Sequence, residues 1–170
     1  LTDHLGPTSR FDPAIKDRAI AASAGVPRLV ERLDALLATH NTADAASVLD
    51  AIEATQIEYR EELLLDTLLA ASPPRVRRLL ALLSIYEIAV PLEACLPLDP
   101  DTDLQPDLQH AVRTGLVHAG IHPRTGEQRY LVSPLVRPLL ANYDEALTHA
   151  ETTVTQERAA RTLYNLWISQ

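Results

Sequence analysis

The stretch that decides the fold runs from residue 72 to residue 140. Residues 72–98 read SPPRVRRLLALLSIYEIAVPLEACLPL, and residues 108–140 read LQHAVRTGLVHAGIHPRTGEQRYLVSPLVRPLL. Leucines at helical spacing after the double proline predict a helix, followed by a short extended run, a short helix and a second longer helix. Two β-type runs separated by a Pro-Arg-Thr-Gly turn predict a hairpin before a last helix. This order is typical of a winged helix, and we assign residues 72–142 to it.

Three further regions flank this stretch. Residues 1–10 contain a glycine and a proline without periodicity and are predicted to be a linker. Residues 11–71 are predicted to form a helical subdomain, in which residues 43–71 are either one long helix or two helices joined near Thr55. Residues 143–170 predict one more amphipathic helix or a helical hairpin. The expected fold class is therefore mainly α, with a two-stranded β-hairpin.

The composition indicates a folded protein with an aliphatic core. Hydrophobic residues make up 46% of the chain, too many for a disordered protein, whereas aromatic residues make up only 4%. The formal net charge of −8 argues against nucleic acid as the main partner, because phosphate binding requires Lys and Arg. The single cysteine cannot form an internal disulfide, and no apolar run reaches the ~18–20 residues that span a bilayer. We therefore expect a cytoplasmic protein without a membrane partner.

The chain begins at Leu1, contains no methionine and has no signal-peptide pattern at its start. We expect it to be a segment of a longer protein. None of its five glycines lies in the G-x-x-x-x-G-K-[ST] pattern of a phosphate-binding loop. The segment alone is therefore expected to be no enzyme and to hold no cofactor by itself.

The candidate reactive side chains favour structural roles. Four residues of a strand span about 13 Å, so His118 and His122 are too far apart to share one zinc ion. Cys95 is expected to fill the core from an apolar helix face. No Ser/His/Asp or Cys/His set has the spacing of a catalytic site. Three arginines after the double proline are expected to lie on the exposed first turns of a helix: Arg75, Arg77 and Arg78.

Several motifs resemble, in their order along the chain, the signal-transducing STAND ATPases, a group that includes the NB-ARC proteins. Gly25-Val26-Pro27, which opens a leucine-rich helix, resembles the GxP motif in the lid of these proteins. LLALLSIYEIAVPLEACLPL (79–98) and HAVRTGLVHAG (110–120) resemble the first half of their winged helix. RYLVSPLVRPLL (129–140) resembles the strand and helix that close it. Residues 143–170 would then begin a helical array, which in such proteins is often tetratricopeptide-like.

The resemblance implies a regulatory role. In this family the lid and the winged helix fold over ADP or ATP that a separate upstream P-loop domain holds. The GxP proline packs near the adenine base, and a histidine of the winged helix touches the β-phosphate of ADP. Pro27 corresponds to that proline, and Ser133 stands where the histidine is expected. A serine hydroxyl can also bind phosphate, but the place of Ser133 before Pro134 favours a helix N-cap over a phosphate ligand.

The segment would then relay the nucleotide state of the upstream domain to a downstream helical sensor or effector. The implied partners are that nucleotide-binding domain and a protein bound through the C-terminal helices, with oligomerisation on activation. A winged helix that reads DNA is one alternative. Its second long helix, however, carries Asp103 and Asp107 at its start and Arg113 as its cation, which disfavours phosphate contacts. A passive helical scaffold that recruits a protein partner is the other alternative.

Overall fold

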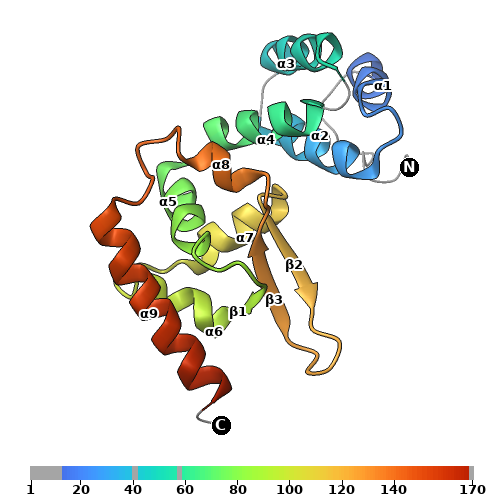
Figure 1. The fold of residues 1–170 in the computed structure, drawn as a ribbon. Helices are drawn as coiled ribbons and strands as arrows, with labels where there is room; N and C mark the ends of the chain where they lie inside the picture. Colours follow the sequence, from blue (N-terminus) through green and yellow to red (C-terminus); the bar gives the residue numbers. More distant parts are fainter. Residues whose placement is uncertain (1–12, 40–41, 57–58, 169–170) are drawn as a thin grey trace. The chain divides into compact units, whose positions relative to one another are not determined.

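The structure, a computed structural model, describes residues 13–39, 42–56 and 59–168. The chain divides into two compact units, Leu1–Ala71 and Ser72–Gln170 (Figure 1). The described residues are mainly helical and include a small antiparallel sheet, so the mainly α prediction is confirmed. The predicted linker, residues 1–10, lies outside the described residues. None of the helices within the described ranges combines the length and the apolar character that crossing a lipid bilayer requires.

The first unit is helical throughout its described part. Its elements are α1 (Pro13–Ala22), α2 (Pro27–Thr39), α3 (Thr42–Ala54) and α4 (Arg60–Ala71). The region that the sequence allowed to be one helix or two is therefore two, α3 and α4. Helix α2 packs against α4, and α1 packs against α3, through buried leucine, isoleucine and alanine side chains. A buried arginine of α2, Arg32, pairs with Glu61 of α4 and so links the two helices.

The second unit surrounds a three-stranded sheet with short helices. Its elements are α5 (Pro74–Leu83), β1 (Val90–Pro91), α6 (Leu92–Cys95), the 3-10 turn η2 (Leu96–Leu98), α7 (Gln105–Arg113), β2 (Val117–Ile121), β3 (Gln128–Val132), α8 (Val136–Leu140) and α9 (His149–Trp167). Residues 143–170 were predicted to begin a helical repeat array. The structure places α9 in the same compact unit, where it packs against α6 and η2 (Figure 1).

The sheet has one more strand than the predicted hairpin. Strands β2 and β3 form the antiparallel hairpin, and β1 pairs with the other side of β3, so that Val90 lies opposite Tyr130. Proline lacks a backbone N–H and is tolerated in a sheet only at an edge, which fits the place of Pro91 in β1. The extended run before Pro91 therefore becomes an edge strand that ties α6 to the hairpin.

Helix α5 lies at the centre of the core of this unit. Its apolar side chains are buried as predicted, and Leu79 and Leu80 are 0% exposed. Helix α5 packs against α7, α8 and β3. Cys95 also fills the core as predicted, and burial raises the pKa of its thiol to about 12. A thiol with such a pKa is inert at neutral pH because the reactive thiolate is scarce.

We predict that two glycines of the hairpin differ in their tolerance of alanine. Gly126 lies in the tip with φ +72°, whereas Gly120 lies in β2 without a positive φ, and a Cβ at either position would meet no atom within 4 Å. Gly126→Ala should therefore lower the free energy of unfolding by about 1 kcal/mol through backbone strain alone. Gly120→Ala should change it by less than about 0.5 kcal/mol. Urea unfolding measures both, and an equal loss in the two variants would contradict the strain argument.

Candidate functional site

The Gly25-Val26-Pro27 element forms a fixed turn between α1 and α2. Ala24 and Gly25 both have positive φ, +48° and +78°, which reverse the chain, and Pro27 begins α2 as predicted. The hydroxyl of the buried Ser23 donates to the carbonyl of Ile20 at 2.7 Å and accepts from the N–H of Gly25 at 3.4 Å. Pro27 itself is exposed. The turn therefore presents the proline ring to solvent on a rigid support.

The sequence did not indicate the residue that holds this turn from behind, Arg60. Its guanidinium donates from Nη1 to the carbonyl of Ala22 at 2.6 Å and from Nε to the carbonyl of Thr55 at 3.0 Å. It thereby satisfies carbonyls at the ends of α1 and α3, which helix ends otherwise leave without partners. A single arginine at the start of a helix carries no sequence signal for such a role, because one of its acceptors, the carbonyl of Ala22, is 38 residues away in the chain.

Ser133, the second residue that the resemblance suggested, lies at the end of β3 and is 1% exposed. Its N–H donates to the carbonyl of Leu116 at 3.0 Å, and its carbonyl accepts from the N–H of Val136 at 2.9 Å. Helix α8 begins at Val136, and its N-cap is Leu135 without a side-chain hydrogen bond. The prediction that Ser133 caps this helix is therefore wrong. The backbone turn at residues 133–136 begins the helix instead. Pro27 belongs to the first unit and Ser133 to the second.

Of the three arginines of α5 that were predicted to be exposed, Arg75 is exposed, whereas Arg77 and Arg78 are partly enclosed. Arg77 is largely enclosed, with its side chain 15% exposed, and both Nε and Nη2 donate to the carboxylate of Glu145 at 2.9 and 2.8 Å. Its Nη1 also donates to the carbonyl of Ser72 at 2.6 Å, and its guanidinium lies 5.2 Å from the ring centre of Tyr143. The guanidinium lowers the pKa of Glu145 by hydrogen bonding. Arg77 thus holds the connection between α8 and α9 against α5.

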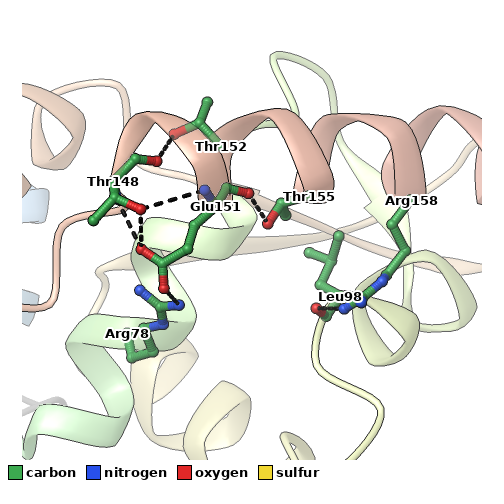
Figure 2. A network of polar contacts seen from close by, with 7 residues as sticks. All are labelled: Arg78, Leu98, Thr148, Glu151, Thr152, Thr155 and Arg158. Carbon is green, nitrogen blue, oxygen red and sulfur yellow. Dashed lines mark hydrogen bonds and ion pairs between the residues drawn. The ribbon is translucent and has the colours of Figure 1, made fainter.

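Arg78 holds the start of α9 in the same way (Figure 2). Thr148 and Glu151 form a capping box, in which the Thr148 hydroxyl accepts from the N–H of Glu151 and the Glu151 carboxylate accepts from the N–H of Thr148. Arg78 pairs with the other carboxylate oxygen of Glu151. Two turns further along α9, Arg158 donates to the carbonyl of Leu98 at 2.6 Å. Helix α9 is therefore fixed to both α5 and η2.

Arg75 reaches the start of α7. Its Nε lies 3.3 Å from Oδ2 of Asp107, and its Nη2 lies 3.4 Å from the carbonyl of Asp103. Beside this pair is a hollow of about 730 Å³, bordered by α5, the chain between η2 and α7, and the chain before α9. The acidic start of α7 is thus paired with α5 and lines this hollow.

His122 of the hairpin has a local contact. The N–H of Thr125 donates to Nδ1 of His122 at 3.2 Å and so stabilises the tip between β2 and β3. Within the described residues, no group of three or more His, Cys, Asp or Glu side chains is arranged to hold a metal ion. Comparisons of the chain with protein-family models, with curated proteins and with solved structures find no match. The arguments for function therefore come from the geometry and from the sequence motifs.

We predict that Glu151 makes the stability of the second unit depend on pH. Hydrogen bonds from the Thr148 hydroxyl and backbone, and then from Arg78, lower the pKa of Glu151 from 4.5 to about 2. A carboxylate with a lowered pKa in the folded state contributes stability that is complete above its unfolded pKa and is lost as the pH falls through the folded pKa. Glu151→Gln should therefore be less stable at pH 7 and should lose less stability than the parent between about pH 5 and pH 2.

Urea unfolding at several pH values, followed by the fluorescence of the single tryptophan in α9, Trp167, measures this difference. Glu157→Gln is the matched control, because Glu157 is an exposed residue of the same helix. If the free energy of unfolding falls by the same amount on acidification in the parent chain and in Glu151→Gln, the prediction is contradicted.

Proposed function

We propose that this chain is a non-catalytic regulatory segment of a STAND-type ATPase, which relays the nucleotide state of an upstream P-loop domain to a downstream helical sensor or effector. The observation that carries the proposal is the order of parts. The described part of the first unit has four α-helices and a Gly-Val-Pro turn, and it precedes a unit with the succession α5, β1, α6, α7, β2, β3 and α8. We propose that the first unit is the lid and that the second contains the winged helix.

The strand pairing supports the winged-helix assignment. The β2–β3 hairpin follows α7 directly, and β1, which comes between α5 and α6, pairs with β3 at the edge of the sheet. Helix α7 packs against both α5 and β2. The long hairpin would be the wing, and Figure 1 shows it extending away from the helices of its unit.

The contacts of α9 support a relay. Arg77 pairs with Glu145 ahead of α9, Arg78 pairs with Glu151 in its first turn, and Arg158 donates to Leu98. Because these contacts fix α9 at several points, a rigid-body movement of the proposed winged helix would carry α9 with it. Near the end of α9, Tyr164, Trp167 and Ile168 are 58%, 46% and 68% exposed. Exposed aromatic side chains of this kind are enriched at protein–protein interfaces. We therefore propose that a protein partner binds at the C-terminal helices and that activation leads to oligomerisation.

The two residues proposed to contact the nucleotide, Pro27 and Ser133, differ in their exposure to solvent. Pro27 is exposed on a rigid turn and could pack against an adenine base held by another domain. Ser133 is enclosed, and both of its backbone polar groups are in hydrogen bonds. A phosphate contact by Ser133 would therefore require the turn at residues 133–136 to open. We propose that Pro27 makes the main contact of this segment with ADP or ATP.

The experiment uses the complete gene product that contains this chain. Pro27→Ala should weaken ADP binding about fivefold, because it removes part of one apolar contact with the base. Pro74→Ala is the matched control, since Pro74 also begins an exposed helix turn but lies in the other unit. Isothermal titration with ADP measures both. The absence of a P-loop in the complete protein, or equal affinities of the two variants, would overturn the proposal.

The DNA-binding alternative predicts a different result. Asp107 of α7 is paired with Arg75, and in the hairpin Arg129 lies 3.7 Å from Glu127, so carboxylates accompany the cations near the expected groove-reading elements. We expect no retention of mixed-sequence duplexes by this chain in a gel shift at low salt, where electrostatic binding is strongest. Retention that an excess of unrelated DNA fails to displace would favour the DNA-binding alternative.

A further inference from the structure

The hollow beside Arg75 is bordered by parts of the second unit that are distant in sequence. Arg75 and Arg78 of α5 form one side, and the acidic chain between η2 and α7 forms another. A second hollow of about 330 Å³ lies against α9 and shares Arg78, Leu82 and Asp99 with the first. Together they form a continuous surface along α5, which we call the α5 groove. The first hollow is open to solvent, and its volume lies in the range of protein sites that bind a ligand.

The α5 groove is strongly negative. Six carboxylates and two guanidinium groups line its larger hollow, and the carboxylates are those of Asp99, Asp101, Asp103, Asp107, Asp144 and Glu145. Both guanidinium groups are already in ion pairs, Arg75 with Asp107 and Arg78 with Glu151, and Glu145 is paired with Arg77. Asp101 and Asp144, which come from different segments, are both exposed. Clustered charge of one sign beside a low-dielectric wall raises the local concentration of oppositely charged groups.

One carboxylate oxygen inside the larger hollow is incompletely satisfied. Oδ2 of Asp107 is enclosed, and among the described residues it accepts no hydrogen bond, although Nε of Arg75 lies 3.3 Å away. Buried carboxylate oxygens normally accept hydrogen bonds, because leaving them without one costs free energy. Because this oxygen is enclosed and paired with Arg75, it is not available to a ligand, whereas the carboxylates of Asp101 and Asp144 are exposed.

The smaller hollow adds an apolar surface to this negative one. Val154 of α9 is 53% exposed, and Ala150, one turn before it, is also exposed. Arg78 lies between the two hollows, where its ion pair with Glu151 keeps the start of α9 against α5. Figure 2 shows Arg78 and Glu151 at one end of the α9 segment and Arg158 at the other.

We propose that the α5 groove is a docking site for a basic peptide segment, with arginine or lysine side chains in the larger hollow and a neighbouring apolar side chain against Val154. The carboxylates come from two separate segments, residues 99–107 and residues 144–145, which favours a peptide with several cationic side chains over a single small cation. The guanidinium group suits the larger hollow, because it offers several N–H donors to carboxylates on more than one side. This proposal does not depend on the proposed nucleotide relay.

The test measures binding of a fluorescein-labelled peptide of alternating arginine and leucine to the 170-residue chain by fluorescence anisotropy. An ionic strength of about 0.15 M shortens the range of electrostatic attraction to about 8 Å, which limits unspecific attraction to the negative chain. A peptide of alternating glutamate and leucine serves as the probe control and should not bind. The double variant Asp101→Asn/Asp144→Asn should bind the basic peptide about five- to tenfold more weakly.

The matched control is Glu31→Gln/Glu157→Gln, which removes the same amount of charge from exposed positions outside the α5 groove. We expect this control to weaken binding less than about twofold. Equal weakening in the two double variants would mean general attraction to an acidic protein and would overturn the proposal. Unchanged binding in the groove variant would overturn it as well. Circular dichroism and urea unfolding check that both variants keep the parent fold, which exposed substitutions of this kind preserve.

Discussion

Helix α5 is the element on which the second unit depends. One face buries apolar side chains such as Leu79 and Leu80, and the other carries arginines whose guanidinium groups each hold a different segment. Arg75 reaches α7, Arg77 reaches the chain before α9, and Arg78 reaches the first turn of α9. The apolar face supplies most of the stabilisation, because burying a large aliphatic side chain contributes about 1.5–3 kcal/mol. The arginines determine where the neighbouring segments lie.

The ion pairs of α5 differ in what they contribute. Arg77 and Glu145 are both largely enclosed and form two parallel hydrogen bonds, a geometry that is specific as well as strong. Removing one partner would leave a charge without compensation in a poorly solvated place. Arg78 and Glu151 are more exposed, so their attraction is screened, but Glu151 also completes the capping box of α9. One carboxylate therefore both begins a helix and attaches it, which makes α9 suited to move together with α5.

The candidate site was only partly predictable from the sequence. The Gly25-Val26-Pro27 turn follows from local rules, since glycine adopts positive φ easily and proline favours the first turn of a helix. Arg60, which supports that turn, gave no signal, because its acceptors belong to α1 and to the end of α3. Ser133 was predicted as a helix cap from its place before proline, but the backbone of β3 and α8 took over that role. Patterns over neighbouring residues do not report such competing partners.

The sequence by itself determined much of the local structure of this protein: α1, α2 and α5 begin at prolines, the hairpin turns at Gly126, and leucines mark the buried faces. These features depend on backbone geometry and on apolar periodicity, which act over a few residues. Only the tertiary structure decided that Val90 and Pro91 join the hairpin as a third strand, and which carboxylate each arginine of α5 meets. Those choices depend on which segments the buried leucines bring together. An arginine side chain pairs with the carboxylate that packing places within its reach, whatever their separation in sequence.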